Sequence, residues 1–241
     1  MVLSLYLKKL NTYRRFIVMN YDAQPTVVRS QGSALVTNKL LRSTYILLGM
    51  TLLFSALTAG ASMAYNLPHP GMIITLVGYF GLLFLTTKLR NSAWGIASVF
   101  ALTGFMGLTL GPIINYYLQM NGGSQIVMQA LGGTGIIFFA LSAYAIKSEK
   151  DFSFMGGFLM VGILVAFLAG LGAFFFEMPG LSLAVSAMFV LLMSGLILYQ
   201  TSEIIHGGET NYIMATVTLY VTIYNLFTSL LHLLGAFGGN D

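Results

Sequence analysis

The sequence predicts an all-α membrane protein in which seven transmembrane helices form one bundle. Hydrophobic residues make up 57% of the 241 residues and charged residues only 7%, and the mean hydropathy is +0.84. A soluble domain carries about 25% charged residues, so this chain has too few to cover a surface that faces water. Its composition excludes a soluble enzyme, a disordered chain and a nucleic-acid-binding module. Apolar runs of the length that crosses a bilayer, about 20 residues, recur along the chain.

These apolar runs follow one another with mostly short connections, and no charged residue lies in the middle of any run. Short connections make consecutive helices antiparallel neighbours. The predicted spans, in chain order, are Ser43 to Tyr65, Pro70 to Thr87, Ser92 to Leu110, Gln125 to Ile146, Phe152 to Phe176, Leu181 to Gln200 and Tyr212 to Ala236.

The breaks between spans carry residues that interrupt an apolar helix. Four of them are rich in proline, glycine or charge: 66–70, 88–91, 147–151 and 177–180. After the sixth span, Gly207 and Gly208 predict a helix stop, because glycine readily takes the left-handed conformation found at helix C-termini. Thr210 or Asn211 then fits the N-cap of the seventh span.

The basic residues predict the orientation of the bundle. The formal charge is +4, and seven of the 11 Lys and Arg residues precede the first span, with two more in each of the second and fourth connections. The first, third and fifth connections hold none. Because Lys and Arg mark the cytoplasmic side, we expect a cytoplasmic N-terminus and a periplasmic C-terminus. The sixth connection should also be cytoplasmic, although it holds no Lys or Arg.

The predicted organisation has three parts: a cytoplasmic N-terminal tail at 1–42, the transmembrane domain at 43–236 and a short C-terminal tail at 237–241. Two interpretations of the first residues are retained. Leu3 to Val18 forms a basic amphipathic helix on the cytoplasmic leaflet, or translation begins at Met19 and 1–18 is a mis-assigned start. Tyr21 to Thr37 is polar, contains Pro25 and Gly32, and is predicted to be a flexible tail.

The residues do not predict an enzyme, a cofactor or a metal. The chain has no cysteine, which excludes thiolate catalysis, cysteine-ligated metals and disulfides, and it has no phosphate-binding or dinucleotide fingerprint. Glu203, His206 and Glu209 are spaced like ligands on one helix face, but the glycine pair divides them and disfavours a metal site. Ser194 and His232 are the candidates for an intramembrane serine protease, and Ser194 is more typical of a small packing residue.

A polar face runs along the seventh span. Its members recur at helical spacing and are joined by a residue at the end of the sixth span: Thr218, Thr222, Asn225, Ser229 and His232, with Gln200. One interpretation is a polar pathway for an ion, a proton or water between these two helices. The favoured interpretation is hydrogen bonding across a packed helix interface, which is common in membrane bundles.

Glycine is abundant, with 27 residues. Gly107 and Gly111 form a small-xxx-small pair in the third span. Small residues let helix backbones approach closely, and we interpret the pair as close packing within one bundle in preference to homodimerisation.

Several sequence stretches resemble the transmembrane Bax inhibitor motif family (the BI1 family), most closely its bacterial YccA-like branch. The resemblance covers about Thr37 to Phe237. The matching stretches are 95–98, 104–107, 110–112, 130–134, 136–138, 199–201, 204–209, 212–213 and 219–227, and Gly135 stands where the family usually has alanine. The stretch 204–209 includes the loop motif His206, Gly207, Gly208 and Glu209.

The resemblance implies a seven-helix bundle in the inner membrane of a bacterium. In relatives an aspartate pair shares a proton and gates a calcium leak. Here the matching positions are Gln200 and Thr222, and neither titrates. A calcium leak channel without the pH-sensing pair, lined by Gln200, Thr222 and Asn225, is therefore the alternative function.

The YccA-like branch is also associated with the membrane-bound AAA protease FtsH. The function that this implies is modulation of membrane-protein quality control, with the chain as a slow, substrate-like competitor. The polar segment that such a protease would engage is Tyr21 to Thr37, with Gln24 inside it. The expected partners are membrane lipids and an FtsH-type protease, and no nucleic acid is expected.

Overall fold

The computed structural model describes residues 25–148 and 150–238, with side chains from Val36 onward. Helices are the regular structure throughout these residues: α2 Pro25–Ala64, α3 Met72–Leu89, α4 Trp94–Leu118, α5 Gly123–Ser148, the 3-10 turn η1 Ser153–Met155, α6 Gly156–Phe175, α7 Pro179–His206 and α8 Tyr212–Gly238. In this part of the chain seven helices are long and apolar enough to cross a membrane. The predicted all-α class and its seven spans are confirmed.

The first helix begins earlier than predicted. α2 starts at Pro25, so Pro25 to Thr37 is helical where the sequence predicted a flexible tail. Proline fits the first turn of a helix, because an amide there has no helical partner, and polarity keeps a segment out of lipid without preventing a helix. Tyr21 and Gln24 lie outside the described residues, as do both interpretations of residues 1–18. The chain divides into two units at Lys39 and Leu40, and the contacts below concern the second.

Two other helices run past their predicted ends. α4 continues through Pro112 to Leu118; membrane helices tolerate an internal proline because neighbouring groups satisfy the freed carbonyl. α7 continues to His206 and ends where Gly207 takes a φ of 81°. The predicted glycine stop is therefore confirmed at Gly207.

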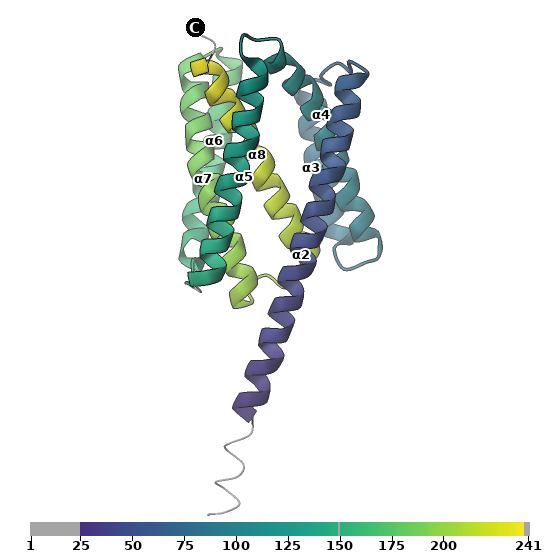
Figure 1. Ribbon diagram of the computed structural model, residues 1–241, viewed down its shortest axis with the longest axis vertical. Helices are drawn as coiled ribbons and strands as arrows, with labels where there is room; N and C mark the ends of the chain where they lie inside the picture. Colours follow the sequence, from purple (N-terminus) through teal and green to yellow (C-terminus); the bar gives the residue numbers. More distant parts are fainter. Residues whose placement is uncertain (1–24, 149, 239–241) are drawn as a thin grey trace, which may run out of the picture. The chain divides into compact units, whose positions relative to one another are not determined.

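α8 is the central helix of the bundle that the structure describes from Leu40 to Gly238. It contacts α4, α5 and α7, and Figure 1 shows it between α5, α6 and α7 on one side and α3 and α4 on the other. Its fully buried side chains include Leu219, Tyr220 and Leu226. α3, by contrast, has Thr86 as its buried residue. The position of α8 places its polar residues inside the bundle.

The second, fourth and sixth connections meet at one end of the bundle. Nδ2 of Asn211 donates hydrogen bonds to the Arg90 carbonyl at 3.1 Å and to Oδ1 of Asn91 at 2.8 Å. On the fourth connection, the Phe152 amide donates to Oγ of Ser202 near the end of α7, at 2.9 Å. The sixth connection, which lacks Lys and Arg, therefore lies beside the two connections that carry them.

Candidate functional site

The predicted polar face on α8 is partly buried, with Thr222 and Ser229 buried and Thr218, Asn225 and His232 intermediate. Thr222 is fully buried, and its hydroxyl donates to the Thr218 carbonyl at 2.7 Å. Asn225 donates from Nδ2 to the Val221 carbonyl at 2.8 Å. These donors return to their own helix, which satisfies them without a partner helix.

His232 joins α8 to α7. Its Nδ1 lies 2.7 Å from Oγ of Ser186, a residue that the sequence did not single out. The Ser194 hydroxyl instead donates to the Val190 carbonyl of its own helix at 2.7 Å. His232 therefore has Ser186, and not Ser194, as its hydroxyl partner, and this contact is of the interhelical kind.

Gln200 on α7 is 5% exposed, and its Nε2 has no hydrogen-bond partner among the described residues. The hydroxyl oxygens of its neighbour Thr201 and of Tyr45 on α2 are 3.4 Å apart. A buried donor without a partner costs about 1–3 kcal/mol. Gln200 is thus an unsatisfied polar group inside the bundle, in the region that the sequence singled out.

Sequence reasoning missed a hydrogen-bonded group centred on Tyr220. The Tyr220 hydroxyl is 2.6 Å from Oγ of Ser55 on α2 and donates to the Thr103 carbonyl on α4 at 3.2 Å. One turn further, the Tyr224 hydroxyl is 3.4 Å from Oγ1 of Thr109. A signal was present, because tyrosine in membrane proteins gathers at the interfaces and these two stand within a span.

Two cavities flank α8. The first has a volume of about 530 Å³ and is lined by side chains of α3, α4, α6, α7 and α8, Asn225 among them. The second, of about 410 Å³, is lined by α2, α4, α5 and α8, and Tyr220 belongs to its wall. Tyr224 lines both. None of the residues lining either cavity carries a charge.

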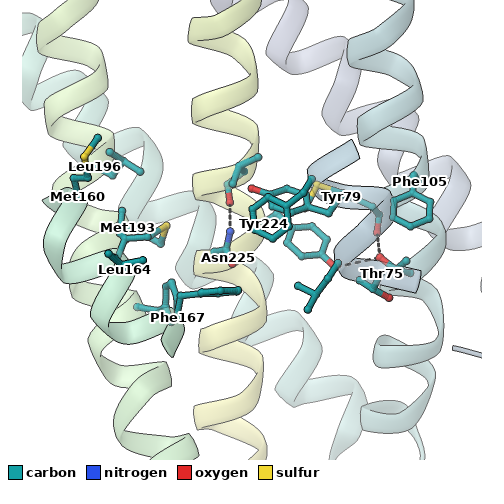
Figure 2. Close-up of a pocket in the computed structure, with 17 residues that line it drawn as sticks. Thr75, Tyr79, Phe105, Met160, Leu164, Phe167, Met193, Leu196, Tyr224 and Asn225 are labelled. Carbon is teal, nitrogen blue, oxygen red and sulfur yellow. Dashed lines mark hydrogen bonds between the residues drawn. The ribbon is translucent and has the colours of Figure 1, made fainter. Parts of the chain in front are cut away.

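The first cavity has an aromatic and sulfur-rich wall with few polar groups. Figure 2 shows Tyr224 and Asn225 of α8 between Tyr79 on one side and Met193 on the other. Where α3 faces α6, the rings of Phe80 and Phe167 meet edge to face with centroids 6.1 Å apart. This cavity can hold an apolar molecule and offers it a small number of hydrogen-bonding groups.

The loop motif builds the turn between α7 and α8. Oε1 of Glu209 accepts hydrogen bonds from the amides of Thr210 and Asn211 at 2.8 and 2.7 Å. A Cβ at Gly208 would meet the carboxylate of Glu203, so a larger residue there would displace that side chain. Nδ1 of His206 donates to the Ser202 carbonyl at 3.0 Å. Among the described residues no group of acidic and histidine side chains could hold a metal.

Asn211 completes this turn as the N-cap of α8, as one of the two predicted candidates. Its Oδ1 accepts hydrogen bonds from the amides of Ile213 and Met214 at 3.0 and 3.1 Å. On the fourth connection, hydrogen bonds from Ser153 hold the pKa of Asp151 below its ordinary value. Asn211, just after the motif, therefore joins two connections and caps a helix.

Comparisons with known proteins match nearly the whole membrane domain. A family model described as "Inhibitor of apoptosis-promoting Bax1" matches residues 37–239. A relative in Escherichia coli, named modulator of FtsH protease YccA, is 56% identical over 203 residues, which cover 84% of this chain and 92% of the relative. An uncharacterised protein of Pseudomonas aeruginosa is 55% identical over 202 residues, covering 84% and 91%. An uncharacterised membrane protein of Vibrio cholerae is 46% identical over 217 residues, covering 90% and 97%.

Proposed function

The chain belongs to the Bax inhibitor family of membrane proteins, and we propose that it modulates membrane-protein quality control by binding a membrane-bound AAA protease of the FtsH type. It is a multi-pass protein of the bacterial inner membrane. In the proposed role it is a slow, substrate-like competitor and not an enzyme. The observation that carries the proposal is the likeness to the relative named a modulator of FtsH protease, over nearly the whole of that relative.

Slow processing is consistent with how the bundle is packed. A protease of this kind must pull helices out of the bilayer one after another. α8 packs against α4, α5 and α7, and it carries hydrogen bonds to α2, α4 and α7. Separating these helices in lipid would leave buried polar groups without partners, which costs free energy. Extraction from the N-terminus should therefore be slow from its first step, because α2 must be pulled away from α8.

Engagement needs a chain segment outside the bilayer, and proteases begin at such termini. We assign this role to Tyr21 to Thr37, within a cytoplasmic region at 1–42 that precedes the membrane domain at 43–236 and the short tail at 237–241. The segment is polar, and the unit that holds it ends at Lys39. The polar part of α2, at 25–37, is easily unfolded, because a short helix in water that packs against nothing is only marginally stable.

The proposal requires the N-terminus in the cytoplasm and the C-terminus in the periplasm. The meeting of the sixth connection with the lysine- and arginine-bearing second and fourth connections supports this orientation. Alkaline phosphatase fused after Asp241 is expected to be active, and the same enzyme fused before Met1 inactive. Activity of both fusions, or of neither, would contradict the assigned orientation.

Turnover in bacterial cells tests the function. The full chain should disappear slowly in a pulse-chase experiment and persist in cells depleted of the FtsH-type protease. Deleting residues 21–37 should lengthen its half-life severalfold, because the protease loses its starting segment, and a serine- and glycine-rich replacement of equal length should restore turnover.

Competition is measured in the same cells. Overproducing the full chain should lengthen the half-life of a second membrane substrate of the protease. The proposal is wrong if this half-life is unchanged, or if the chain turns over at the same rate with and without the protease. Equal expression and equal thermal stability of the deletion variant in detergent serve as the control for folding.

A further inference from the structure

The first cavity beside α8 lies at the middle of the membrane. Asn225 stands thirteen residues from either end of α8, since 225 − 212 and 238 − 225 are both 13. At about 1.5 Å per residue this is ~20 Å from each end. Tyr79 is likewise near the middle of α3, Met72–Leu89. The part of an occupant that reaches Asn225 and Tyr79 therefore lies in the hydrocarbon region, below the depth of a phospholipid headgroup.

The cavity opens toward the surface of the bundle that faces lipid. Residues on its lining are strongly exposed: Phe80 by 48%, Met160 by 75% and Leu164 by 57%. The side chains come from α3 and α6, and these helices touch through the ring contact of Phe80 and Phe167. Because these lining side chains are exposed on the surface that faces lipid, a molecule dissolved in the bilayer can reach the cavity without crossing water.

Two polar groups on this wall have unused hydrogen-bonding capacity. The Val221 carbonyl can only accept, so the amide nitrogen of Asn225 must face it, and Oδ1 of Asn225 is left as an acceptor. The hydroxyl of Tyr79 makes no hydrogen bond with the described residues, although it lines the same cavity. The first group needs a donor and the second can donate or accept, so both have capacity for a ligand hydroxyl.

The rest of the lining sets the size and shape of the ligand. A volume of about 530 Å³ lies within the range of about 300–1,000 Å³ typical of small-molecule sites. Aromatic rings at 79, 80, 105, 167, 189 and 224 favour a flat ring, and methionines at 106, 160 and 193 adapt to irregular shapes. No lining residue is charged, so a neutral molecule is favoured.

We propose that this cavity binds a neutral, hydroxyl-bearing ring with an apolar tail, of the prenylated quinol class, taken up from the bilayer. The ring lies among the aromatic side chains, and its hydroxyl bonds to Asn225 and Tyr79. The tail leaves past Leu164 into lipid. This site rests on membrane insertion and not on the proposed protease partner.

Binding of decylubiquinol to the purified full chain in detergent tests the proposal, followed by isothermal titration calorimetry. Saturable binding is expected, with decylubiquinone about tenfold weaker because it has no hydroxyl to offer Asn225; losing one hydrogen bond in a dry site corresponds to about that factor. Asn225→Leu should weaken decylubiquinol binding by about tenfold and Tyr79→Phe by a smaller factor. Leu164→Trp should block the entrance and abolish binding.

Thr134→Val, in the second cavity, is the matched control and should bind like the wild type. Tyr79→Phe keeps the aromatic ring, so weaker binding by this variant reports the lost hydroxyl and not a folding defect. Dioctanoylglycerol, an alcohol with acyl chains and no ring, is the second probe. If it binds more tightly than decylubiquinol and the same substitutions weaken its binding, the site is for a chain alcohol and the proposed ring ligand is wrong. No saturable binding of either probe, or equal binding by all variants, would overturn the site itself.

Discussion

Replacing Gly107 by alanine is expected to destabilise the bundle by about 2 kcal/mol, the cost typical of overpacking. A Cβ at Gly107 would collide with Oγ1 of Thr58 and the backbone carbonyl of Ser55, and it would lie 2.9 Å from Oγ of Ser55. A backbone atom cannot move aside as a flexible side chain can. α4 must therefore separate from α2, which also strains the hydrogen bond from Ser62 to the Leu108 carbonyl.

Gly49→Ala is the matched control for this prediction. Gly49 also lies in a membrane-spanning helix, α2, and nothing lies within 4 Å of the position of its Cβ. Alanine is a better helix former than glycine by about 1 kcal/mol, so this variant should be unchanged or slightly more stable. The free energy of unfolding, measured in mixed micelles with increasing dodecyl sulfate, distinguishes the two. Equal free energies of unfolding for the two variants would show that the close approach of α4 to α2 does not contribute to stability.

Replacing Tyr220 by phenylalanine is expected to destabilise the bundle by about 1–2 kcal/mol, since it removes one hydroxyl that serves two partners. The ring is 1% exposed, and phenylalanine keeps its volume, so the loss reports the hydrogen bonds and not packing. Oγ of Ser55 and the Thr103 carbonyl would lose their contact with Tyr220 inside the bundle. Tyr116→Phe, at a position that is 61% exposed, is the control and should be neutral.

A double-mutant cycle sharpens this test. If the contact between Ser55 and Tyr220 is the source of the effect, Ser55→Ala combined with Tyr220→Phe should cost less than the two single changes together. A coupling free energy of about 1 kcal/mol is expected for residues in direct contact. Strict additivity in the same unfolding experiment would mean that the 2.6 Å contact contributes nothing, and would leave the Thr103 carbonyl as the relevant partner.

Much of the fold was readable from the sequence because a bilayer imposes simple rules. Every span must be long, apolar and helical, so the seven runs and their approximate limits followed from hydropathy. The glycine stop at Gly207 and the cap at Asn211 were also predicted, since both are local chemistry. The helix limits near Pro25 and Pro112 were harder to predict, because a proline is compatible with both the start of a helix and a tolerated interior position.

The candidate site was predicted only in part. Periodicity identified the polar face of α8, including Asn225 and His232, but it could not identify what each side chain contacts. Neither Tyr220 nor Ser186 was singled out as a hydrogen-bonding residue. The partner of a buried polar group comes from another helix, far along the chain, as with Ser55 and Tyr220.

The sequence by itself determined that this chain crosses a membrane, where its helices lie and which family it resembles, because the free energy of placing each residue in lipid depends mainly on that residue and its neighbours. Only the tertiary structure decided that α8 is the central helix, that Gly107 meets the backbone of α2 and that Asn225 lines a cavity beside it. Helix packing in lipid depends on shape complementarity and hydrogen bonds between distant segments, and neither is written in a local pattern.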